Sequence, residues 1–144
     1  MNWKEEATEK LRKYDAMQQS VKNLPEELQR LEYAASAISS PRMDGTPVKG
    51  FSNRQEDMLV SNLVHRKELT NALEQAKLWV STADRALGVL TAEEKLILHR
   101  MYIYPERNAV ERLCGELGVE QSSIYRKRDQ ALIRFTVALY GGVC

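Results

Sequence analysis

A long stretch without glycine or proline is the feature that most constrains the fold. Residues 52–87 contain neither, so they can form one helix of roughly 50 Å at 1.5 Å per residue. Ser52 and Gln55 have the spacing of a capping box, which predicts that the helix begins there. Apolar residues then recur in steps of four and three, a heptad seam formed by Leu69, Leu73, Ala76, Val80, Ala83, Leu87 and Leu90. A long helix with one narrow seam is not stable alone in water, so it needs a partner.

The segment before this helix supplies a candidate partner. Residues 3–39 carry apolar or small side chains mostly in alternating steps of three and four, which predicts helix. Pro25 removes a backbone donor, so either a second helix starts there or one long helix kinks. Two prolines and two glycines in SSPRMDGTPVKG predict a loop, which we place at residues 39–52. We therefore expect a helical hairpin scaffold over residues 1–88; self-association through the same seam is the alternative, and the sequence does not separate the two.

Charge and motifs exclude several classes of function. The 21 Lys and Arg against 20 Asp and Glu give a net charge of +1, so any nucleic-acid binding must come from local clustering. The chain has no catalytic or phosphate-binding motif, its two cysteines form no CxxC, and its two histidines are isolated. We therefore expect neither an enzyme nor a metal site nor a cofactor. It also lacks a signal peptide and a membrane-length apolar run, so we expect a cytoplasmic protein that does not enter membranes.

The pattern changes after Gly88 from long helices to short ones, and we place a second domain at residues 89–144. Thr91 and Glu94 form a capping box, which predicts a helix from about Ala92 to Tyr102. Asn108 and Glu111 repeat this arrangement and predict a second helix, which ends at Gly118 with positive φ. A third helix should run from about Gln121 to Tyr140. Its expected core stripe is Ile124, Ala131, Leu132, Phe135 and Leu139.

The last two of these helices have the features of a helix-turn-helix motif. Two helices joined by a tight glycine turn cross closely, which requires a small residue at the crossing, here Cys114, and apolar residues on each side of the turn. The expected apolar residues are Leu113, Leu117, Val119 and Ile124. In this motif the first turns of the second helix enter the DNA major groove. The candidate DNA-binding residues are Gln121, Ser122, Ser123, Tyr125, Arg126, Lys127, Arg128, Arg107 and Arg112.

At these residues the sequence resembles a known family. From LTAEEKLILHRMYI through LCGELGVEQSSIYRKRDQALIRF to LYG, it is similar to the C-terminal helix-turn-helix domain of sigma factors, and more closely to phage transcriptional activators of the RinA and ArpU type. The loop SPRMDGTPVKG between two long helices extends the resemblance to the N-terminal half. The resemblance implies a base-reading face at Gln121, Ser122, Tyr125 and Arg126. The chain departs from the family at Lys127, where an aliphatic residue is usual; the alkyl stem of a lysine can snorkel there.

The resemblance implies an all-α regulator of phage or prophage origin that binds double-stranded promoter DNA and activates late, packaging-related genes. RNA polymerase and a second copy of the chain are the further partners that we expect. The alternative function is a phage DNA-packaging or assembly factor, similar to a small terminase subunit, which would use the same domain without a role in transcription. Such subunits form rings, whereas a promoter activator should be a monomer or a dimer.

Overall fold

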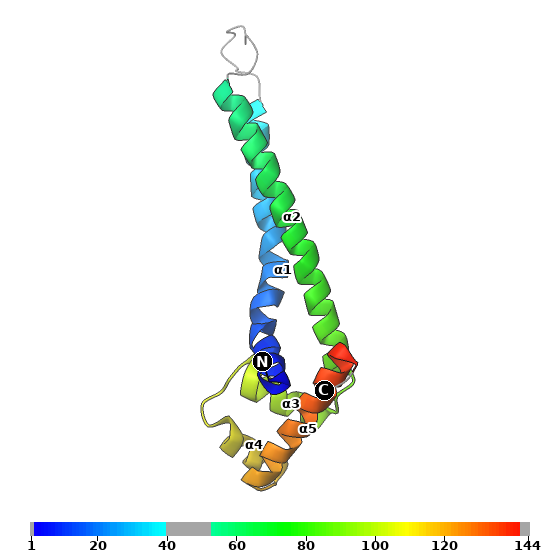
Figure 1. The fold of residues 1–144 in the computed structure, drawn as a ribbon. Helices are drawn as coiled ribbons and strands as arrows, with labels where there is room; N and C mark the ends of the chain where they lie inside the picture. Colours follow the sequence, from blue (N-terminus) through cyan, green and yellow to red (C-terminus); the bar gives the residue numbers. More distant parts are fainter. Residues whose placement is uncertain (1, 40–52, 142–144) are drawn as a thin grey trace. The chain divides into compact units, whose positions relative to one another are not determined.

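The computed structural model describes residues 2–39 and 53–141, and in these ranges the protein is all-α (Figure 1). Helix α1 spans Trp3–Ser39 and α2 spans Asn53–Gly88. They are followed by α3 (Ala92–Leu98), a π-helical turn η1 (His99–Ile103), α4 (Ala109–Leu117) and α5 (Gln121–Tyr140). The expected all-α fold, with two long helices followed by short ones, is confirmed.

The two long helices agree with the predicted hairpin. Helix α1 continues through Pro25, so the helix does not restart there. Except for Ser39, which ends α1, the predicted loop at 39–52 and its capping residue Ser52 lie outside the described residues. The described part of α2 begins at Asn53.

The chain forms two compact units. The first unit consists of Met1–Gln18 and Leu78–Cys144, and the second of Gln19–Lys77. Residues before and after the expected boundary near residue 88 therefore share the first unit. Its core joins apolar side chains of α1, α2, the turn after α2, α3, η1 and α5: Ala7, Leu11, Ala86, Leu90, Leu98, Tyr102, Ile103, Ala131, Leu132 and Phe135.

In both units α1 and α2 contact each other as antiparallel helices. In the first unit the Tyr14 hydroxyl donates a hydrogen bond to Asp84. In the second unit Asn62 Nδ2 donates to the Leu31 carbonyl at 2.9 Å. The heptad seam of α2 is the side that is covered, since Ala76 and Ala83 are buried there. These contacts bear out an intramolecular hairpin.

The short helices begin and end largely where local signals place them. Thr91 and Glu94 form the predicted capping box, with both reciprocal hydrogen bonds present. Gly118 ends α4 at φ 66°, and Gly141 ends α5 at φ 83°. The expected helix from Ala92 to Tyr102 is in fact α3 followed by the π-helical turn.

The predicted cap at Asn108 is wrong. Asn108 does precede α4, but its φ of 58° and ψ of 37° are left-handed, and its side chain makes no capping hydrogen bond. A capping side chain reaches the free N–H groups of the first turn from an extended backbone. Asparagine tolerates the left-handed region better than most residues, and it serves here as a turn residue.

Candidate nucleic-acid interface

The α4 and α5 helices cross through a small apolar core of their own. Ile97, Leu113 and Ile124 are fully buried in it. Leu96, Met101, Val110, Cys114, Leu117 and Val119 pack around these three as partly buried residues. The predicted anchors of the helix-turn-helix motif therefore do meet, and α3 contributes Ile97 as the third wall.

A glycine turn fixes the path from α4 to α5. The N–H groups of Gly118 and Val119 both donate to the Cys114 carbonyl, at 2.9 and 3.3 Å. The left-handed backbone of Gly118 allows this arrangement, which is typical of a helix C-terminus. Cys114 is only partly buried, so it lies at the edge of the crossing that we assigned to it.

The first turns of α5 project an exposed polar face. Gln121, Ser122, Tyr125 and Arg126 are all exposed, which matches the face expected from the sequence. Gln121 Nε2 lies 3.5 Å from the Tyr125 hydroxyl, and Arg126 donates to the Ser123 hydroxyl oxygen at 3.3 Å. Both contacts are long and neither partner is an acidic side chain, so the side chains can exchange them for contacts with a ligand.

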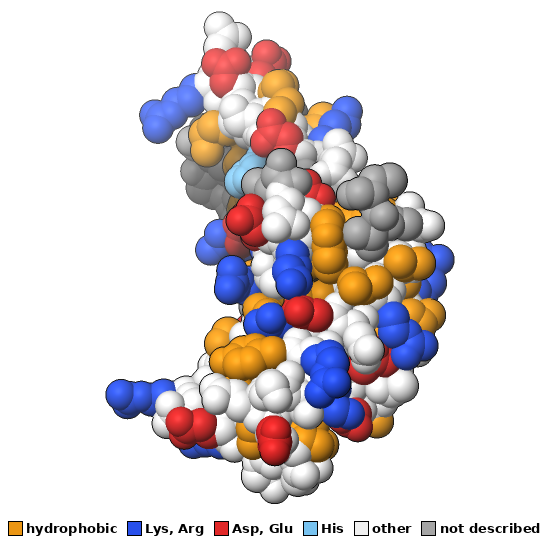
Figure 2. Space-filling view, turned by 60° about the horizontal axis from the view of Figure 1, so that its bottom comes forward, with side chains coloured by type: hydrophobic (Ala, Val, Ile, Leu, Met, Phe, Trp, Pro, Cys, Tyr) orange, Lys and Arg blue, Asp and Glu red, His pale blue; other side chains and the backbone are white. Residues whose placement is uncertain are grey.

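The cationic candidates divide into paired and unpaired side chains. Lys127 pairs with Glu93 at 2.5 Å, Arg128 with Asp129 at 2.9 Å, and Arg112 with Glu106 at 3.4 Å. Arg107 and Arg126 are exposed and pair with no acidic side chain among the described residues. Figure 2 likewise shows Lys and Arg interspersed with Asp and Glu on the face in view. Charge counting along the sequence could not reveal the Lys127–Glu93 pair, because Glu93 lies on another helix.

Asp129 anchors the middle of α5 to α1. Its Oδ1 atom lies 3.1 Å from Lys4 Nζ and 2.9 Å from the Arg128 guanidinium. Partial burial acts to raise the pKa of Asp129, but the hydrogen bonds from Lys4 and Arg128 outweigh it and hold the pKa below its ordinary value. Arg128 also lies 5.0 Å from the ring of Tyr125, so Asp129 and Tyr125 together orient this guanidinium.

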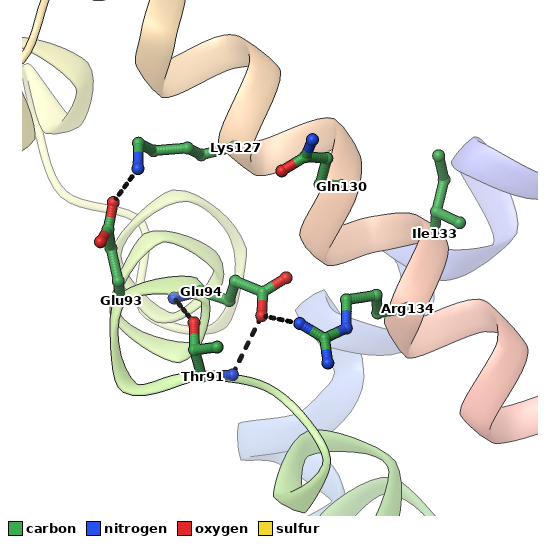
Figure 3. A pocket seen from close by; sticks show the side chains of 7 residues that line it. All are labelled: Thr91, Glu93, Glu94, Lys127, Gln130, Ile133 and Arg134. Carbon is green, nitrogen blue, oxygen red and sulfur yellow. Dashed lines mark hydrogen bonds and ion pairs between the residues drawn. The ribbon is translucent and has the colours of Figure 1, made fainter.

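A shallow pocket separates α5 from the start of α3 (Figure 3). Glu94 Oε1 accepts hydrogen bonds from the Thr91 N–H at 3.0 Å and from Arg134 at 2.8 Å. Lys127 reaches Glu93 on the same side. The pocket thus contains two ion pairs that brace α5 against α3. The sequence identified Glu94 only as a capping residue, since nothing in it shows which residue lies across the helix pair.

Lys127 is the position where the sequence departs from the family that it resembles. Its side chain is half-buried, and its ammonium group reaches Glu93. The side chain is thus partly buried beside the start of α3 while its charge stays at the surface, as in snorkelling lysines.

Other kinds of site find no support among the described residues. No group of three His, Cys, Asp or Glu side chains in residues 2–39 and 53–141 lies close enough to hold a metal ion. None of the described helices is both long and apolar enough to cross a membrane. Comparisons with protein-family models, with curated proteins and with solved structures gave no match.

Proposed function

We propose that this chain is a sequence-specific, DNA-binding transcription regulator of phage or prophage origin. In this proposal α5 enters the major groove of promoter DNA and the protein activates late or packaging genes. The observation that carries the proposal is the pair α4 and α5, joined by a left-handed glycine and closed by its own apolar core, with the first turns of α5 exposed and polar. The resemblance to sigma-factor and RinA- or ArpU-type domains supports the same function.

The exposed side chains suit the recognition of base edges. An arginine can donate two hydrogen bonds to guanine O6 and N7, and a glutamine can pair with adenine N6 and N7. Arg126 and Gln121 lie on the first turns of α5 and have no strong partner to give up. We therefore assign base contacts to Arg126 and Gln121, and supporting contacts to Ser122 and Tyr125.

The remaining cations would contact phosphates. Arg107 has no acidic partner among the described residues, whereas Arg112, Lys127 and Arg128 would share their charge with existing partners. Each neutralised phosphate adds about 0.9 to the slope of log K against log salt. With so few free cations, we expect a shallow slope and weak binding to random DNA.

The alternative, a DNA-packaging or assembly factor, would use the same α4–α5 surface. The two functions differ in their assemblies, since a small terminase-like subunit forms a ring whereas a promoter regulator acts as a monomer or dimer. Direct contact with RNA polymerase belongs to the first function only. A run-off transcription assay with host polymerase therefore separates them: added protein should increase transcript from the bound promoter.

The proposal is tested by selecting sites from a random DNA library with the full chain and then measuring the affinity of two arginine variants. Arg126→Ala should cost about 1 to 3 kcal/mol on the selected site and relax the preference at one base pair. Arg85→Ala removes the same charge from α2, where Arg85 donates to the Ser81 carbonyl, and should have little effect. No enriched sequence at low salt would refute sequence-specific binding. Equal losses for Arg126→Ala on selected and random DNA would restrict Arg126 to phosphate contact.

A further inference from the structure

The second unit has an inverted distribution of polar and apolar side chains on α2. Asn62 is buried against α1, where Nδ2 donates to the Leu31 carbonyl and Oδ1 accepts from Arg66 Nε at 2.8 Å. At about 100° per residue, Val60 and Val64 lie on the opposite side of the helix. They are 60% and 49% exposed. Around position 62, the side of α2 that faces α1 is therefore polar, and the side that faces away from α1 is apolar.

The second unit also buries little apolar surface. Among the side chains described in it, those of residues 19–38 and 53–77, the buried ones are Asn62 and Ala76. Two helices alone cover each other on one side only, and stable helical bundles add a further layer over the exposed sides. Leu63 is 46% exposed and lies beside Val60 and Val64, which widens the uncovered surface.

The charges around this surface indicate what covers it. Asp57 lies three residues before Val60, and Lys67 lies three residues after Val64, so the four form one stripe along α2. Asp57 and Lys67 are both exposed, and neither forms an ion pair with a described residue. Ten residues separate them along the helix, about 15 Å at 1.5 Å per residue. They are too far apart to pair with each other in one chain.

The stripe is self-complementary when a second α2 runs antiparallel to the first. Asp57 and Lys67 are equally distant from position 62, and so are Val60 and Val64. An antiparallel copy therefore places Asp57 against Lys67 of the second copy, and Val60 against its Val64. The exposed polar residues Asn53 and Asn71 continue the stripe at both ends and would face each other in the same way. The seam of a coiled coil alternates between two kinds of position. In an antiparallel pair, a position of the first kind on one helix faces a position of the second kind on the other helix, as in these pairs.

We propose that a second copy of this chain docks on this face of α2, antiparallel, with a twofold axis beside position 62. Each dimer then contains two Asp57–Lys67 ion pairs flanking two Val60–Val64 contacts. Such an interface is isologous, so the same residues serve both copies and the assembly closes as a dimer. An unrelated partner would not require the charges and valines to be arranged symmetrically. The inference does not depend on DNA binding.

The test is a charge-reversal cycle on the full chain, with association measured by sedimentation equilibrium over a wide concentration range at low salt. Asp57→Lys alone and Lys67→Asp alone each create two like-charge contacts per dimer, and each should weaken dimerisation about tenfold or more. The double variant Asp57→Lys/Lys67→Asp restores opposite charges across the interface and should recover most of the loss. Glu9→Lys reverses an exposed charge in the first unit and should leave dimerisation unchanged.

Several outcomes would overturn the proposal. A parent chain that sediments as a monomer at every concentration, or as a ring, has no closed interface of this kind. A dimer that tolerates both single reversals uses another surface. A double variant that stays as weak as the single ones, with unchanged helical content by circular dichroism, excludes this antiparallel register.

Discussion

Two glycines three residues apart should respond in opposite directions to the same substitution. Gly118 has φ 66° and ψ 34°, while Gly115 lies within α4. A Cβ atom added at either position meets no atom within 4 Å. Packing therefore contributes nothing to the difference in stability between the two alanine variants. The backbone conformation alone decides whether each substitution stabilises or destabilises the protein.

The magnitudes follow from that conformation. An L-residue in the left-handed region costs about 1 to 2 kcal/mol. Alanine also reduces the conformational freedom of the unfolded chain, which offsets part of this cost. Gly118→Ala should therefore destabilise the protein by roughly 1 kcal/mol. Alanine in a helix is better than glycine by about 0.5 to 1 kcal/mol, so Gly115→Ala should stabilise it. Gly118→Asn should cost less than Gly118→Ala, because asparagine enters the left-handed region more readily.

Urea denaturation followed by circular dichroism at the helical band measures the three variants against the parent. In thermal melts each kcal/mol corresponds to about 2 to 4 °C for a chain of this size. A Gly118→Ala variant as stable as the parent would refute the left-handed turn between α4 and α5. A destabilising Gly115→Ala would show that Gly115 approaches another part of the protein, against the open space found there.

The other predictions concern single side chains of the first unit. Glu94→Ala loses both the hydrogen bond from the Thr91 N–H and the ion pair with Arg134, and should cost about 1 to 2 kcal/mol of stability in urea denaturation. Glu94→Gln keeps the capping hydrogen bond and should cost under about 1 kcal/mol, because Arg134 is half exposed. Equal losses for the two variants would contradict a role for the cap. Cys114→Ala should be nearly neutral and Cys114→Leu should cost about 1 to 3 kcal/mol by overpacking, so a leucine variant that melts like the parent would place the crossing elsewhere. The lowered pKa of Asp129 means that its carboxylate stabilises the fold above the ordinary carboxyl pKa, and this stabilisation is lost as the pH falls through the pKa of the folded state. Asp129→Asn should therefore lower the melting temperature at neutral pH and make no difference in acid. A constant difference at all pH values would contradict this linkage.

Local signals predicted most helix boundaries, because a cap or a left-handed glycine acts within one turn of its own position. Thr91, Gly118 and Gly141 each end or begin a helix where the sequence places them. Asn108 shows the limit of such signals. An Asn followed by a Glu three residues later fits both a cap and a left-handed turn, and the choice depends on the path of the chain from η1 to α4.

The sequence predicted which residues lie on the exposed face of α5, but it did not predict which cations of the candidate site form ion pairs. The spacing of α5 places Gln121 and Arg126 outward, since helical periodicity decides which side faces the core. Whether a cation is free depends on residues far along the chain, such as Glu93 opposite Lys127. The π-helical turn after α3 was also missed, because the nearest helix-breaking residue, Pro105, lies beyond its end at Ile103.

The ion pairs formed by these cations affect how strongly such a protein would bind DNA. A surface whose cations are mostly free gains affinity from phosphates on any sequence, but here Lys127, Arg128 and Arg112 already have acidic partners. One copy of the motif would then bind weakly, and its preference would come from a few contacts such as that of Arg126. Two linked copies can gain about 10² to 10⁴ in avidity when both sites are engaged. The proposed dimer through α2 would supply that gain without extra charge, which is consistent with a chain whose net charge is only +1.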